Sequence, residues 1–168
     1  SFAQTQNNDG AKHLLSKHLA NAKASFQLAL ELDPLFPVSK LNLLAVSLML
    51  EQHTTLEPIF LDQNEMISQH PNYKLLLALY YFKDNQFEKA LEFARLAETC
   101  DEIKPLAQLL IGDTFFKLDD INQAVVYWKL ASVYEPLFFF LKQRELGLTS
   151  YYEDPEKLIC DFELTFTQ

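Results

Sequence analysis

Apolar residues along the chain recur at the spacing of amphipathic helices, and these helices come in pairs joined by short polar turns. The clearest helices are predicted over residues 73–84, 87–100, 106–118 and 121–134. The turns inside these two pairs are Asp84-Asn85-Gln86 and Asp119-Asp120. Because Asp and Asn side chains accept hydrogen bonds from the first backbone amides of a helix, each turn favours the start of a second helix. The pattern therefore predicts antiparallel helix pairs and an all-α fold.

The paired pattern repeats with a period of 34 residues. The positions that show it best are Ala90 and Ala124, Ala97 and Ala131, and Pro37, Pro71 and Pro105. A fixed period of this length is typical of repeat proteins, in which each unit buries its apolar face by stacking on its neighbours. We therefore predict a helical solenoid over residues 10–168. Its approximate repeats are residues 3–36, 37–70, 71–104 and 105–138, followed by a C-terminal pair over 139–168.

The N-terminal part of the chain is less regular. Residues 1–9 are polar, which predicts a frayed segment ahead of the solenoid. No helix breaker stands between Ser16 and Leu19, so residues 11–32 form either one long helix or two.

Two further parts of the pattern complete the prediction. The second helix of the second repeat, which includes Leu56, is displaced along the chain and ends at His70-Pro71. The C-terminal pair is predicted as helices over residues 139–152 and 156–167, with Asp154-Pro155 as the cap and first turn of the second one. An amphipathic last helix would give the stack a polar outer side.

Small, aromatic and proline residues occupy corresponding positions in several repeats. One repeat carries Gly112, Phe115, Ala124, Ala131 and Pro136, and another carries Ala78, Tyr81, Phe87, Ala90 and Ala97. A partial third set is Gly10, Ala22, Phe26, Ala29 and Pro34. In this arrangement the chain resembles the tetratricopeptide repeat family over roughly residues 10–138. The resemblance implies a right-handed α-solenoid of about four to five antiparallel helix pairs, whose first helices line a concave groove. The second repeat departs from the family pattern, with Leu44 and Leu56 at positions that prefer small residues.

Composition and charge narrow the range of functions. The net charge is −9 and no cluster of Lys and Arg occurs, whereas a duplex-binding protein needs such a cluster, so we expect no nucleic-acid partner. Lys40, Asn42 and Glu51 interrupt the longest apolar stretch, so we expect no membrane insertion. Cys100 and Cys160 lack CxxC spacing. This favours a reducing compartment such as the cytoplasm and leaves an exported or periplasmic location open.

No group of residues has the spacing of a catalytic or metal site. The histidines are His13, His18, His53 and His70. No pair of them has the i, i+4 separation of a helical zinc site, and none adjoins a cysteine with ligand spacing. Three glycines are too few and too scattered for a phosphate-binding loop. We therefore predict that the protein is not an enzyme and has no catalytic residue, metal site or cofactor.

The first helices of the repeats supply the candidate binding site, because the resemblance places them on the concave wall. The predicted groove residues are Leu41, Ala45, Asn72, Leu75, Leu79, Phe82, Leu109, Asp113 and Phe116. Residues 75–82 leave no polar face, and a helix that is apolar all round must be covered all round. The groove would hold an apolar or amphipathic segment of a partner protein, with Asp113 choosing its orientation. Alternatively, these leucines are mutual core contacts.

Taken together, the sequence predicts a non-enzymatic protein–protein interaction module, a scaffold or adaptor. The positions of the family's carboxylate clamp are apolar here apart from Asn42, so a cochaperone that grips acidic chaperone tails is not expected. Two alternatives stay open. One is a chaperone-like secretion cofactor, and the other is an architectural subunit or homo-oligomer whose groove is filled by a neighbouring chain.

Overall fold

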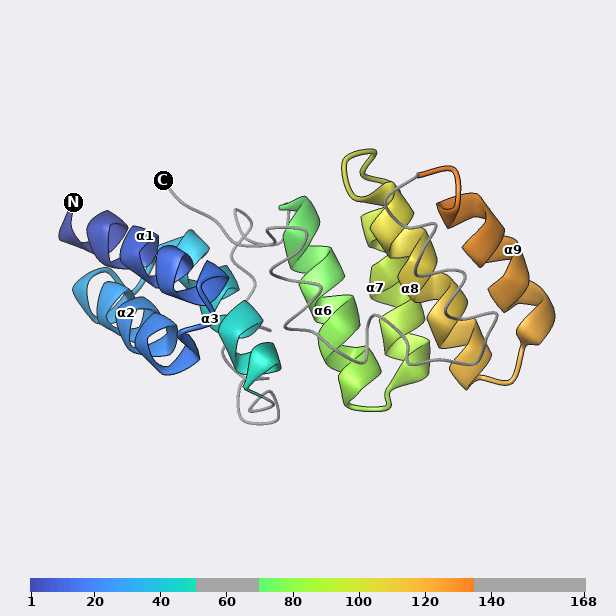
Figure 1. The fold of residues 1–168 in the computed structure, drawn as a ribbon, viewed down its shortest axis with the longest axis horizontal. Helices are drawn as coiled ribbons and strands as arrows, with labels where there is room; N and C mark the ends of the chain where they lie inside the picture. Colours follow the sequence, from blue (N-terminus) through green and yellow to red (C-terminus); the bar gives the residue numbers. More distant parts are fainter. Residues whose placement is uncertain (51–69, 135–168) are drawn as a thin grey trace. The chain divides into compact units, whose positions relative to one another are not determined.

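Helices account for all the regular structure that the computed structural model describes, which covers residues 1–50 and 70–134. The helices are α1 (Phe2–Leu15), α2 (Leu19–Leu32), α3 (Pro37–Met49), α6 (Pro71–Lys83), α7 (Phe87–Glu98), α8 (Lys104–Lys117) and α9 (Ile121–Ala131) (Figure 1). Each packs mainly against its neighbour in sequence, and no strand occurs in these two described stretches. The prediction of an all-α fold is confirmed. The helices predicted over residues 73–134 correspond to α6, α7, α8 and α9.

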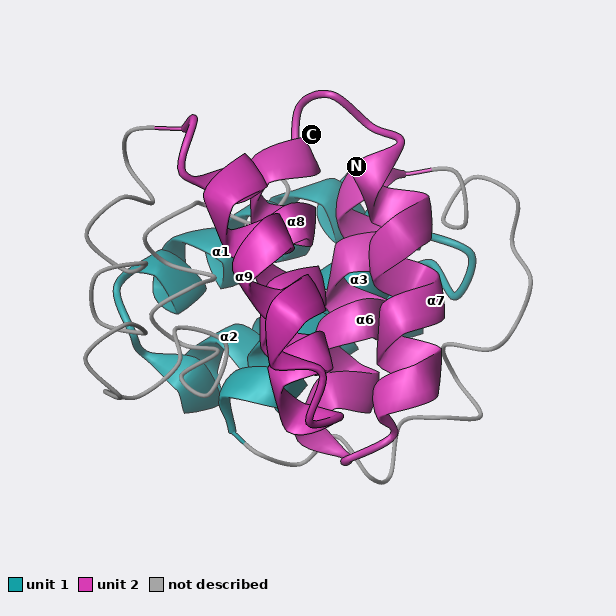
Figure 2. Ribbon diagram, turned by 90° about the vertical axis from the view of Figure 1, so that its right-hand side faces the viewer, with its two compact units in different colours: residues 1–69, 155–168 teal, residues 70–154 magenta. Residues whose placement is uncertain are grey.

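The chain divides into two compact units, whose described parts are α1–α3 and α6–α9 (Figure 2). In the first unit α1 packs against α2 and α2 against α3, and α1 also contacts α3. In the second unit α6, α7, α8 and α9 pack in this order, and α6 also contacts α8. In the three pairs whose two helices are both described, α1–α2, α6–α7 and α8–α9, the first helix therefore packs most extensively against the second helix of its own pair.

Three of the turns between paired helices share one backbone conformation. Lys17, Asn85 and Asp119 have positive φ angles of 63°, 58° and 61°. Asn and Asp adopt this left-handed conformation more readily than most residues, and a single such residue commonly ends a helix. Asn85 and Asp119 are one 34-residue period apart, and Lys17 precedes Asn85 by two periods. The left-handed turn residues therefore recur with the same 34-residue period as the sequence pattern.

The hydrogen bonds of these turns repeat as well. A backbone N–H donates to the carbonyl five residues earlier at 2.8 Å from His18 to His13, 2.9 Å from Gln86 to Tyr81 and 2.9 Å from Asp120 to Phe115. The N–H of the left-handed residue also donates to the carbonyl three residues earlier. The two bonds together form a Schellman motif, which satisfies carbonyls at a helix end. Because the motif ends α1 at Leu15, residues 11–32 form two helices and not one.

The N-terminal segment differs from its prediction. The Ser1 Oγ accepts a hydrogen bond from the Gln4 backbone N–H at 3.2 Å, and the Ser1 amino group donates to Gln4 Oε1 at 2.8 Å. This reciprocal pair is a capping box, which starts α1 at Phe2. Ala3 and Asn7 are buried. Residues 2–9 are therefore helical and packed, where their polar composition predicts fraying.

Close approach within the pairs depends on glycine at two places. A Cβ atom added to Gly10 would lie 2.5 Å from Cε1 of Phe26, and one added to Gly112 would lie 2.4 Å from Cδ1 of Trp128. Both distances are far below van der Waals contact. Each aromatic ring thus fills the space that a side chain on the facing helix would need.

Several predicted elements lie outside the described residues. They are the second helix of the second repeat before His70-Pro71 and the C-terminal helices over residues 139–152 and 156–167. Pro71 itself is the first residue of α6, whose N-cap is His70.

Candidate partner-binding surface

The predicted groove residues differ in unit and in exposure. Leu41 and Ala45 belong to the first unit, and the others belong to the second. The buried ones are Leu41, Ala45, Leu75, Leu79, Phe82, Leu109 and Asp113. Asn72 is half-buried, and Phe116 is 50% exposed. Leu75, Leu79 and Leu109 have no exposed surface, which is the burial of core residues. Their role in a binding groove stays a prediction.

The carboxylate of Asp113 bonds within its own helix pair. Its Oδ1 accepts a hydrogen bond from Trp128 Nε1 at 2.9 Å, and the residue is only 3% exposed. A buried carboxylate needs such donors, because its desolvation is costly. Asp113 therefore connects α8 to α9, whereas its sequence position suggests a contact with a ligand.

A buried polar cluster in the first unit was not visible from the sequence pattern. Asn7 Oδ1 accepts hydrogen bonds from Ser39 Oγ at 3.0 Å and from Asn42 Nδ2 at 2.9 Å. All three residues are fully buried. None of them is an acid, base or activated nucleophile, so the cluster connects α1 to α3 without forming a catalytic arrangement.

Among the described residues of the second unit, exposed apolar side chains are most numerous on α9 and on the turn that follows it. Val126 is 50% exposed, Leu130 47%, Val133 89% and Tyr134 42%. We call these four residues the α9 strip. Their i, i+4, i+7, i+8 spacing places them on one side of α9 and the turn that follows it. The same spacing was readable in the sequence, but a second helix was not expected to carry the site.

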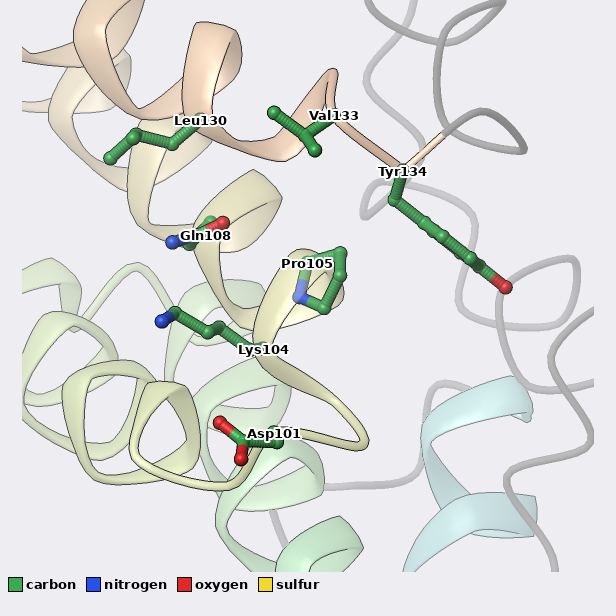
Figure 3. A pocket seen from close by; sticks show the side chains of 7 residues that line it. All are labelled: Asp101, Lys104, Pro105, Gln108, Leu130, Val133 and Tyr134. Atoms are coloured by element: carbon green, nitrogen blue, oxygen red, sulfur yellow. The ribbon is translucent and has the colours of Figure 1, made fainter.

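One end of the α9 strip borders a pocket of about 420 Å³ between the start of α8 and the end of α9 (Figure 3). It is lined by Asp101, Lys104, Pro105, Gln108, Leu130, Val133 and Tyr134. Gln108 is only 7% exposed, and its side-chain amide makes no hydrogen bond to any residue that the structure describes. In the sequence, Gln108 is visible only as a single amide within an apolar run, and this alone does not predict a pocket.

Two titratable groups near the start of α6 have shifted pKa values. Burial lowers the pKa of His70, and the Glu102 carboxylate opposes this by favouring the charged imidazole. His70 Nδ1 accepts a hydrogen bond from the Asn72 backbone N–H at 3.2 Å and so caps α6. Burial, followed by the neighbouring Tyr81, raises the pKa of Tyr73. Both groups act in helix capping and packing.

Within residues 1–50 and 70–134, no group of three or more His, Cys, Asp or Glu side chains is placed to hold a metal ion. None of the helices described is both long enough and apolar enough to cross a membrane. No protein-family model matches the chain, and a search of curated proteins finds no relative. The features that point to a function are therefore the geometry of the helix pairs and the α9 strip.

Proposed function

We propose that the chain is a non-enzymatic protein–protein interaction module built from right-handed helix pairs of the tetratricopeptide type. The observation that carries this proposal is the Schellman turn that recurs at Lys17, Asn85 and Asp119 with the period of the sequence. A repeat of one helix-pair geometry is typical of solenoid proteins, whose extended surfaces bind other proteins. The recurrence supports the family resemblance without depending on any single residue match.

The α9 strip is the surface we assign to partner binding. A predicted groove built on Leu75, Leu79 and Leu109 requires that these buried side chains become accessible, whereas Val126 and Val133 are accessible already. The occupant we propose is an apolar or amphipathic segment of a partner protein. Burying about 400 Å² of its apolar surface would contribute roughly 10 kcal/mol. The costs of association and ordering remove most of this, so we expect micromolar affinity.

The size of the α9 strip favours a peptide segment over a permanent subunit contact. Stable protein interfaces involve about 20–30 residues on each side, and the strip has four residues. An architectural or homo-oligomeric role would need a larger continuous surface. The mass of the isolated protein in solution, measured by light scattering, separates a monomeric binding module from a homo-oligomer.

A pair of neighbouring substitutions tests the proposal. Val126→Glu introduces a charge into the α9 strip, and Val125→Glu introduces the same charge on the adjacent residue, turned by about 100° around the helix. Tagged wild-type and variant proteins are purified from the native host, and the bound proteins are identified by mass spectrometry. We expect a partner that the wild type and Val125→Glu retain and that Val126→Glu loses. Equal recovery by all three proteins, or no specific partner, would contradict the proposal.

A further inference from the structure

The pocket beside the α9 strip combines apolar walls with the amide of one largely buried residue, Gln108. Lys104 and Gln108 lie one helical turn apart on α8, and Leu130 and Val133 face them from the end of α9 (Figure 3). Pro105 and Tyr134 complete the apolar part of the lining. The volume of about 420 Å³ lies within the range of about 300–1,000 Å³ that is usual for sites of small ligands.

The side-chain amide of Gln108 has unused hydrogen-bonding capacity. It carries two donor hydrogens and an acceptor oxygen, and none of these bonds to a described residue although the side chain is more than nine-tenths buried. Among the described residues, the only fully enclosed side-chain polar atom without a partner is Ser47 Oγ, so the Gln108 amide still reaches the open space of the pocket and can pair with a group there. A hydrogen bond formed at such a largely desolvated position contributes more than one at an exposed position. A peptide group offers the matching donor and acceptor.

The charges at the pocket argue against an ion as the occupant. Asp101 and Lys104 are both exposed lining residues of opposite sign. An anion attracted by Lys104 is repelled by Asp101, and the reverse holds for a cation. The lining therefore favours an uncharged backbone segment with an apolar side chain.

We propose that this pocket holds one apolar residue of an extended partner peptide, whose backbone pairs with the Gln108 amide while its side chain lies against Leu130, Val133 and Pro105. The inference rests on the proposed function and adds to it the chemistry of the bound residue. The rest of the peptide would continue along the α9 strip, because Leu130, Val133 and Tyr134 belong to both surfaces.

The probe for this proposal is N-acetyl-leucine N-methylamide, which contains one apolar side chain between two peptide groups. It is titrated into the full isotope-labelled chain and followed by nuclear magnetic resonance. We expect a saturable shift of the Gln108 side-chain amide signals with a dissociation constant of about 1 mM, as suits so small a ligand. We also expect nuclear Overhauser effects from the leucine methyl groups to Leu130 and Val133 of the wild type.

Two variants show whether the amide is responsible. Gln108→Leu keeps the size of the side chain but removes the amide, and should weaken binding by about fivefold to tenfold. Gln123→Leu makes the same change at an exposed position of α9 and should bind as the wild type does. The alanine analogue of the probe should bind more weakly than the leucine probe, because it fills less of the pocket.

The proposal is overturned if no saturable shift occurs, if Gln108→Leu binds as well as the wild type, or if the contacts to Leu130 and Val133 are missing. These contacts are measured on the wild type, so the test does not depend on the folding of a variant. Residues after Tyr134 occupying the pocket would also prevent probe binding and overturn it. Partner capture that is lost with Val126→Glu but unchanged with Gln108→Leu would leave the proposed function standing and remove only the pocket.

Discussion

The helix pairs α6–α7 and α8–α9 have the same backbone turn, yet the outward residues of their second helices differ in kind. On α7 and the residues after it, the positions equivalent to the α9 strip are Glu92, Leu96, Thr99 and Cys100. The α9 strip has Val126 in place of Glu92 and Val133 in place of Thr99. α7 packs against both α6 and α8, whereas the described neighbour of α9 is α8.

This difference separates the residues that a helix pair needs for its own packing from the residues that we propose bind a partner. Ala90 and Ala97 of α7, and Ala124 and Ala131 of α9, are fully buried where each helix meets its partner. The residues required by the pair are therefore the same in both. The apolar side chains that remain exposed on α9 are not needed for packing within the pair. Glu92, the residue of α7 equivalent to Val126, shows that a charged side chain is tolerated at this position. We attribute the exposed apolar side chains of α9 to a partner.

Charged residues introduced into the first helices should destabilise the protein far more than charged residues introduced into the α9 strip. Leu79→Lys combined with Leu109→Lys places two ammonium groups in fully buried positions and should unfold the second unit, at a cost on the order of 5 kcal/mol or more. Val126→Lys combined with Val133→Lys should change the free energy of unfolding by less than about 1 kcal/mol. Circular dichroism during thermal melting measures both. A folded Leu79/Leu109 variant would show that these leucines line an accessible groove.

A smaller loss of stability is expected at one contact where the two helix pairs carry residues of different size. The positions of Gly112 and Trp128 are occupied by Ala78 and Ala94 in the α6–α7 pair. In Gly112→Ala the new Cβ atom meets the indole ring, and moving the ring disturbs its bond to Asp113. The cost should be about 1–3 kcal/mol, and should decrease when Trp128→Ala is also present, as in α6–α7. Denaturant unfolding of the single and double variants gives both values. No coupling between the substitutions would contradict the assigned contact.

A still smaller effect is expected on the pH dependence of stability, and we expect it for the α6–α7 pair but not for the α8–α9 pair. α6 is capped by His70, whereas α8 begins after Ile103, which does not titrate. Because burial holds the pKa of His70 below its ordinary value of 6.5, the unfolded chain binds this proton more readily than the folded chain. The contribution of His70 to stability is therefore complete above pH 6.5 and decreases as the pH falls below it. Thermal melts between pH 7.5 and 5 should show less of this decrease in His70→Asn, since Asn caps a helix without titrating. An identical pH dependence in both proteins would exclude His70 as the cause.

Short-range features of the fold were predictable from the sequence. Polar turns at 34-residue spacing fixed the helix pairs, and the predicted cap is found at Asp120, whose Oδ1 accepts from the Gln123 backbone N–H at 3.2 Å. The cap predicted in the turn before α7 is absent, because the N-cap residue there is Gln86 and its side chain makes no capping hydrogen bond. Such features depend on neighbours along the chain, which a period reveals directly.

Long-range features were less predictable. In the sequence, Asn7 belongs to a polar segment that predicts fraying. In the folded chain it is bonded to Ser39 and Asn42, which are more than 30 residues away along the sequence. Similarly, residues 75–82 have no polar face, so their sequence cannot show which side is covered and by what. Gln108 and the exposed valines of α9 needed the packing of two helices before their surroundings could be recognised.

We propose that the α9 strip, and not the equivalent surface of α7, contacts a partner protein. A photo-crosslinking amino acid at position 133 tests it against the same group at position 99, since Val133 and Thr99 are equivalent and both exposed. After irradiation in the native host, we expect position 133 to form a crosslink to a specific partner protein and position 99 to form none. Crosslinks to the same proteins from both positions, or crosslinks from position 133 only within its own chain, would contradict the claim.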